Sequence, residues 1–145
     1  MLSKLHSRGY RVLLLLEALI CLGVMRVAIL TVPFRKIVAY YHLAQGEAVI
    51  IPAGRKAARA ESIGWAVRAA ASRTPWQSAC LVQSLAAMSM LRRRGIAGTL
   101  YLGVAKNEDN ASEPIAAHSW LRCGKRTLTG YCADNRFTVI AKFSW

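Results

Sequence analysis

Cys80 is the side chain in this sequence whose position best suits nucleophilic chemistry. A helix is predicted from Ser78, a residue type favoured at the N-cap, to Arg94, with Leu81 and Leu85 on its apolar face. Cys80 then lies in the first turn, where unpaired N–H groups and the helix dipole stabilise a thiolate. The alternative is a core cysteine, because a free thiol also packs as a small hydrophobe.

The other three cysteines lack a predicted helix N-terminus. Cys21 lies in an apolar helix, Cys123 in a turn and Cys132 in a loop, so a structural or incidental role is expected for each. No C-x₂-C pair occurs, and four cysteines in 145 residues fit neither a zinc pattern nor a disulfide-dense scaffold. No metal or cofactor site is therefore predicted in this chain, and a reducing, cytoplasmic location is expected.

A cysteine nucleophile needs a base that also protonates the leaving amine, and His118 is the best-placed histidine for this task. It lies within a predicted strand, between small residues, whereas His6 and His42 are expected at the surface. A histidine on a strand can also be purely structural. However, a helix-borne cysteine that faces a strand-borne histidine is the geometry on which papain-type and transglutaminase-type folds build acyl transfer, and the chain order here is Cys then His.

A third group is expected to orient the imidazole of His118. Asp134 is the first candidate and Asn135 the second; both lie in a loop before the last strand, where they can also be simple turn formers. A Cys-His dyad without a third residue is the remaining possibility. Gln77 is a candidate donor to an oxyanion together with the N–H of Cys80, although a Gln before a helix can also be solvated.

The elements that must position these side chains are helices first and strands afterwards. Helices are predicted over 11–30, 34–43, from 57 to about 74, and 78–94, and strands over 99–104, 115–122, 126–129 and 137–143. Runs of helices followed by antiparallel strands indicate the α+β class, with the helices packed on one side of a small sheet.

One compact domain is expected from the length of 145 residues. Within it we predict an apolar and basic helical segment over 1–43, a connector over 44–59 rich in Gly and Pro, and a core over 60–145. The 54% share of hydrophobic residues excludes intrinsic disorder for most of the chain.

The basic charge and the apolar N-terminal helix leave another class open, a small membrane- or nucleic-acid-associated binding protein without catalysis. The net charge of +13 favours acidic partners. Membrane contact is possible, but no span is expected, because Glu17 and Arg26 interrupt the apolar run and each costs about 2.5–3.5 kcal/mol at a bilayer centre. Nucleic acid is not expected as a partner, because the basic residues are scattered and Tyr101, Trp120 and Phe137 lie in apolar strands.

Four short blocks of the sequence match a known family. They are C-L-x-x-S-L-A at 80–86, L-R-R-R-G-I at 91–96, L-G-V at 102–104, and A-H-S-W-L at 117–121 with Gly124 beyond. With them the chain resembles the lasso-peptide biosynthesis B-protein family, in its transglutaminase-like cysteine peptidase module. The apolar N-terminal helix followed by Pro-Phe-Arg at 33–35 is also similar to that family, so the resemblance covers nearly the whole chain.

The resemblance implies a transglutaminase/papain-like cysteine peptidase core with a Cys-His-Asp triad. The implied activity is removal of the leader peptide from a ribosomally made lasso precursor before macrolactam closure. The implied partners are the precursor, a leader-binding protein or domain, and an asparagine-synthetase-like cyclase that uses ATP. Many relatives carry an acidic residue about twelve positions after the histidine, where this chain has Thr129-Gly130, so Asp134 is the substitute candidate. The leader-binding domain is expected on a separate chain.

Overall fold

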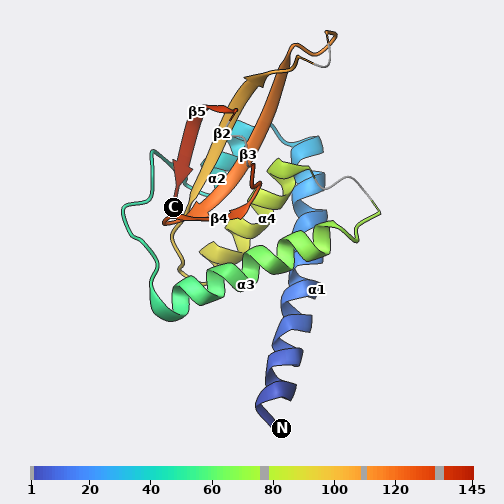
Figure 1. Ribbon diagram of the computed structural model, residues 1–145, viewed down its shortest axis with the longest axis vertical. Coiled ribbons are helices and arrows are strands. Elements are labelled where there is room, and N and C mark those ends of the chain that lie inside the picture. Colours follow the sequence, from blue (N-terminus) through green and yellow to red (C-terminus); the bar gives the residue numbers. More distant parts are fainter. Residues whose placement is uncertain (1, 76–78, 109–110, 133–135) are drawn as a thin grey trace.

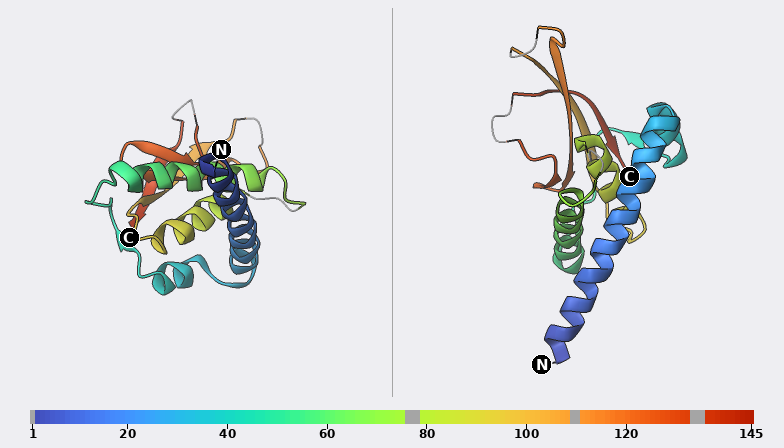
Figure 2. Two further views of the ribbon diagram at one scale, coloured as in Figure 1. Left: turned by 90° about the horizontal axis from the view of Figure 1, so that it is seen from below. Right: turned by 90° about the vertical axis from the view of Figure 1, so that its right-hand side faces the viewer.

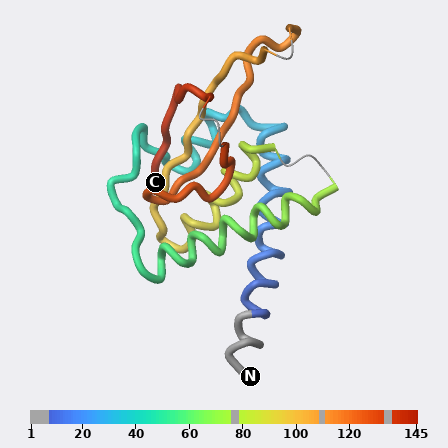
Figure 3. The backbone as a smooth tube through the Cα atoms, in the orientation of Figure 1, coloured from blue at the N-terminus to red at the C-terminus, as the bar shows by residue number. Residues whose placement is uncertain are grey.

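The computed structural model describes residues 2–75, 79–108, 111–132 and 136–145. Figure 3 traces this backbone, and Figure 1 labels its helices and strands. In chain order the elements are α1 (Leu2–Thr31), α2 (Phe34–Tyr40), β1 (Ala44–Gln45), α3 (Gly54–Ala71), α4 (Cys80–Arg92), β2 (Thr99–Lys106), β3 (Ile115–Cys123), β4 (Arg126–Thr129) and β5 (Thr138–Ser144).

The strands form one antiparallel sheet in the order β1-β5-β2-β3-β4. β2 and β3 are the long central pair, and their register places Gly103 opposite His118. β4 is short and pairs with β3 through Leu121 and Thr129. The helices gather on one face of this sheet, as the right-hand view of Figure 2 shows. The predicted α+β class, with helices packed on a small antiparallel sheet, is therefore confirmed.

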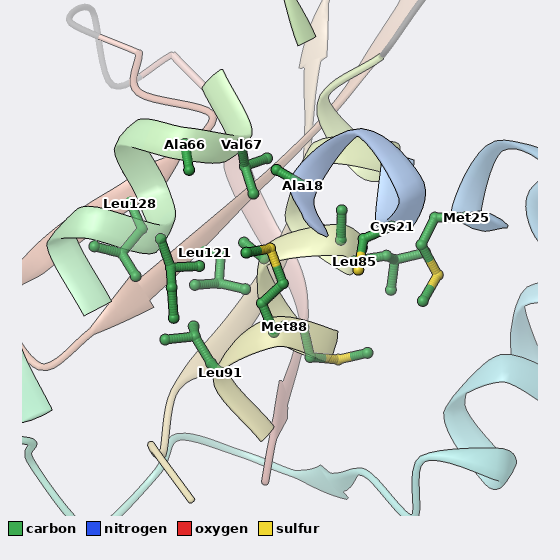
Figure 4. Close-up of a cluster of buried hydrophobic side chains, with 14 of the residues drawn as sticks. Ala18, Cys21, Met25, Ala66, Val67, Leu85, Met88, Leu91, Leu121 and Leu128 are labelled. Atoms are coloured by element: carbon green, nitrogen blue, oxygen red, sulfur yellow. The ribbon is translucent and has the colours of Figure 1, made fainter. Parts of the chain in front are cut away.

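The hydrophobic core lies between α4 and the helix-facing side of the sheet. Side chains alternate along a strand, so Leu121 and Cys123 of β3 face the helices and are buried. α4 is buried almost all round, with Leu85 and Met88 at its centre, and Leu128 of β4 completes this layer. Figure 4 shows these side chains gathered between α1, α3 and α4. α4, whose first residue is Cys80, is thus held in the middle of the molecule.

α1 packs along α3 and α4 with one face only. Its inner side chains Leu14, Ala18 and Leu22 are at most 1% exposed. Glu17 flanks this face, and its carboxylate accepts hydrogen bonds of 2.6 Å from both Arg93 and Arg94. The hydrogen bond from Arg94 is the largest cause that lowers the pKa of Glu17. The charged residue that interrupts the apolar run therefore fastens α1 to the end of α4.

The structure differs from the sequence expectations at several element boundaries and at one helix cap. α1 begins at Leu2, ahead of the predicted start at residue 11. The first residues of α3, from Gly54, and the whole of β1 at Ala44–Gln45 lie in the segment predicted as a connector. A two-residue strand has no periodicity to detect, and only its pairing with β5 defines it. The N-cap of α4 is Ala79 in an extended conformation, not Ser78, which lies outside the described residues.

Candidate active site

Cys80 is the first residue of α4, and its side chain is half-buried. The N-cap residue Ala79 has no side chain that could accept a hydrogen bond from the first turn, and the first backbone bond of the helix runs from the N–H of Gln83 to the carbonyl of Ala79 at 3.1 Å. The backbone N–H groups of Cys80 and the two residues after it therefore precede the helical ladder. Donors in this position stabilise negative charge on a thiolate or on an oxyanion beside it.

His118 projects from β3 on the face of the sheet away from the helices. Its neighbour Ser119 is buried on the helix side, whereas His118 shares the opposite face with Trp120. The Nε2 atom of His118 lies 2.8 Å from the carbonyl oxygen of Gly130. A carbonyl oxygen can only accept, so Nε2 carries the proton in this bond and the neutral imidazole keeps Nδ1 as its basic nitrogen.

Two aromatic side chains contact the imidazole ring of His118. The ring of His118 stacks on Phe137 at 4.8 Å and on Trp120 at 6.0 Å between centroids, and Trp120 in turn stacks on Tyr101 at 5.4 Å. Gly103, opposite His118, makes this packing possible, because a Cβ atom there would lie 2.9 Å from the ring of Trp120. The imidazole is thus oriented by one hydrogen bond and two ring contacts.

A buried contact connects the Cys80 end of α4 with the support of His118. The hydroxyl of Ser84 lies 2.9 Å from the hydroxyl of Thr129, and both residues are fully buried. Ser84 is four residues after Cys80, so the two side chains lie on one face of α4, a single turn apart. Thr129 ends β4 and directly precedes Gly130, whose carbonyl holds His118. This contact therefore links the turn of α4 that follows Cys80 to the segment that holds His118.

No hydrogen bond joins Cys80 to His118 among the residues that the structure describes. Such bonds are commonly long in an enzyme without substrate and shorten in the reacting complex, so the arrangement does not exclude proton transfer between these side chains.

A cavity of about 490 Å³ opens over the imidazole. His118, Trp120 and Gly130 line one part of it, and Tyr131 and Cys132 line another. Cys132 therefore lines the same cavity as the histidine. A peptide carbonyl in this cavity would lie against the outward face of the sheet.

The two remaining cysteines are buried in the core. Burial raises the pKa of the Cys123 thiol to about 12, and it also raises the pKa of Cys21. A thiol in this environment stays protonated at neutral pH and is a poor nucleophile. Cys80 and Cys132, both half-buried, are thus the thiols that are accessible for chemistry.

The comparison with protein families decides what kind of fold carries this site. The family model of the transglutaminase-like superfamily matches residues 28–142. The chain belongs to this superfamily. The match includes α4, the whole of β2 to β4 and the candidate site, and it starts near the end of α1. The comparisons with curated proteins and with solved structures give no match.

In this member of the transglutaminase-like superfamily, the hydrogen-bond partner of His118 among the described residues is a main-chain group. Asp134 and Asn135, the predicted orienting residues, lie outside the described residues, and so does Gln77, the predicted oxyanion donor. The group that contacts His118 is a main-chain carbonyl, at Gly130, which sequence reasoning missed. The available signal was its spacing, because Gly130 is twelve positions after His118, where the resemblance places an acidic residue.

The described part of this superfamily member contains no group of three or more His, Cys, Asp or Glu side chains that could hold a metal ion. The functional groups that it contains are a thiol at a helix N-terminus, an imidazole, and main-chain donors and acceptors beside them. These groups are suited to acyl transfer through a thioester.

Gly130 is expected to be indispensable for this arrangement. Its φ is +70°, and a Cβ atom there would overlap the carbonyl oxygen of Ser119 and lie 2.8 Å from Cα of Trp120. We therefore expect Gly130→Ala to destabilise the fold by about 2–3 kcal/mol and to release His118 from its acceptor. Urea denaturation and activity measurements test this. Gly46→Ala is the control, since its φ is +104° but no atom lies within 4 Å of the added Cβ. Equal effects of the two substitutions would contradict the role of close approach at Gly130.

Proposed function

We propose that this chain is a cysteine peptidase that removes the leader from a ribosomally made lasso-peptide precursor before macrolactam closure. One observation supports the catalytic part of the proposal: Ser84, one turn after Cys80 on α4, contacts Thr129, which directly precedes the acceptor of His118 at Gly130. Membership of the transglutaminase-like superfamily supports cysteine-based acyl chemistry at this place.

The first half of the proposed reaction forms a thioester. Nδ1 of His118 takes the proton of the Cys80 thiol, and Sγ attacks the carbonyl carbon of the scissile peptide bond. The oxygen that becomes negative is stabilised by N–H groups of the first turn of α4. When the C–N bond breaks, the imidazolium gives its proton to the leaving amine. Throughout, Nε2 of His118 donates to the carbonyl of Gly130, which keeps the ring from turning.

The second half releases the leader. Nδ1 of His118 takes a proton from water, the hydroxyl oxygen attacks the thioester carbonyl, and the C–S bond breaks. The leader leaves with a new carboxyl group, and Cys80 recovers its proton. A neutral carbonyl partner stabilises the imidazolium less than a carboxylate would, so Gly130 serves as an orienting acceptor and not as a counter-ion.

The lasso assignment rests on the sequence blocks around Cys80 and His118 and on the basic charge of the chain, which suits an acidic partner. The proposed partners are the precursor, a leader-binding protein and an asparagine-synthetase-like cyclase, which would use the ATP. The proposed location is the cytoplasm, where the thiol of Cys80 stays reduced.

Mass spectrometry of a candidate precursor incubated with the full chain tests the proposal. A candidate precursor is a short peptide that is encoded beside this chain and has a Thr near the end of its leader. The reaction is run with and without the leader-binding partner and the cyclase with ATP. We expect two fragments whose masses add up to the precursor plus one water. An intact precursor under all conditions would contradict the peptidase, and a product that has lost ammonia and gained an amine would identify a transamidase instead.

A further inference from the structure

A second hollow, which we call the basic groove, lies beside the cavity of His118. It has a volume of about 750 Å³ and runs between the first part of α1, α3 and β4. Arg11, Trp65, Arg68, Lys125 and Arg126 line it. These side chains come from three separate elements, so the groove exists only in the folded chain.

The basic groove and the cavity of His118 adjoin each other. Thr127 and Tyr131 line both of them, on either side of the point where β4 ends. A chain lying in the groove would therefore lead past Tyr131 to the imidazole. The groove is accordingly placed to hold the part of a peptide substrate that does not react.

Positive charge in the basic groove exceeds what its own residues neutralise. Four of its lining side chains are cationic, and the carboxylate that also lines it, Glu61, forms an ion pair with Arg126. Arg68 donates to the main-chain carbonyl of Leu128. Within the described part of the chain no carboxylate pairs with Arg11 or Lys125. A ligand with two or more carboxylates could therefore pair with Arg11 of α1 and with Lys125, which directly precedes β4.

Trp65, one of the aromatic side chains that line the basic groove, is already covered by a cation of the protein. The guanidinium of Arg11 lies 5.3 Å from the centre of the Trp65 ring, a cation–π distance. The groove adjoins the cavity of His118, the side chain proposed for acyl chemistry on a peptide bond. This position favours a peptide as the occupant.

We propose that the basic groove binds an acidic segment of the peptide substrate and leads the scissile bond to His118. This inference rests on the proposed peptidase function for the role of the cavity, but the binding itself can be measured without cleavage.

Fluorescence anisotropy with the Cys80→Ala chain tests the groove. The probes are a labelled peptide with four Glu residues and the same peptide with four Gln. We expect the Glu peptide to bind at least 10-fold more tightly, and Arg11→Glu or Lys125→Glu to weaken it at least 10-fold. Both side chains are exposed, so these variants should fold. Lys36→Glu is the matched control, because it makes the same charge change on α2, at the other end of α1.

The outcomes separate this inference from the proposed function. Equal affinity for the two peptides, or an equal loss of affinity in all three charge variants, would contradict the proposal that the groove binds an acidic segment. Tighter binding of a single-stranded DNA oligonucleotide than of the Glu peptide, lost in the Arg11 and Lys125 variants, would overturn the choice of a peptide. If the Glu peptide binds as expected but the wild-type chain leaves the precursor intact, binding in the groove is supported and the proposed peptidase function is contradicted.

Discussion

Replacement of Cys80 or His118 by alanine is expected to lower kcat/KM for leader removal at least ~10³-fold without unfolding the protein. Each substitution removes a chemical role, and both side chains are only half-buried, so the loss of packing is small. The double variant should be no slower than the worse single one, because the thiol and the imidazole act in the same step. Rates measured by chromatography of the cleaved precursor, with circular dichroism as a check of folding, test this expectation.

Cys132→Ala is the decisive control for the assignment of the nucleophile. Cys132 lines the same cavity as His118, so geometry alone leaves it as a competitor. It has no helix N-terminus to stabilise a thiolate, and we expect the alanine variant to keep activity within about 3-fold of the wild type. An active Cys80→Ala together with an inactive Cys132→Ala would assign the reaction to Cys132 and refute the mechanism.

The positions of Cys80 and His118 could be predicted because they follow from periodicity. Cys80 precedes a run of apolar residues at helical spacing, and His118 lies within an alternating strand, so a helix end and a strand were expected there. The helix did begin beside Cys80, and β3 contains His118. The sequence did not predict to which face of the sheet His118 points. That depends on which of the alternating side chains of β3 the helices cover.

The partner of His118 could not be predicted in the same way. Sequence reasoning searched for a side chain, Asp134 or Asn135, because orienting groups are usually carboxylates or amides. The acceptor at Gly130 is a backbone oxygen, which every residue has, so no residue type marks it. Only the close approach of Gly130 to Ser119 and Trp120, which excludes any side chain, makes this glycine necessary. Such an approach is a property of the packed strands.

Leu22→Asp in α1 is expected to unfold the protein, whereas Ile20→Asp on the same helix should be tolerated. Leu22 is completely buried between α1 and its neighbours, while Ile20 is 68% exposed. An aspartate at position 22 combines the loss of a core leucine with an unpaired buried carboxylate, at a cost of about 5 kcal/mol or more. For Leu22→Asp, the soluble yield, the melting temperature and the rate of leader removal should therefore all fall. For Ile20→Asp, all three should stay close to the wild-type values.

The same pair of variants distinguishes a packed helix from one that spans a membrane. By length and composition, Arg8–Thr31 could cross a bilayer, and its outward face carries exposed apolar side chains such as Leu16 and Val27. In a spanning helix, aspartate at either Ile20 or Leu22 faces a cost of about 2.5–3.5 kcal/mol, so the two variants would behave alike. In the folded module they differ, because only one face of α1 is covered by α3 and α4 (Figure 2).

Fractionation of the wild-type chain completes this argument. We expect carbonate washing to release it from membranes whether or not the proposed leader-binding protein and cyclase are co-expressed, because the core contacts of Leu22 and the ion pairs of Glu17 with Arg93 and Arg94 hold α1 against the module. A helix cannot keep these contacts and also cross a bilayer on its own. Retention of the wild type in the washed pellet under both conditions, with Ile20→Asp and Leu22→Asp equally impaired, would show that α1 leaves the module and spans the membrane.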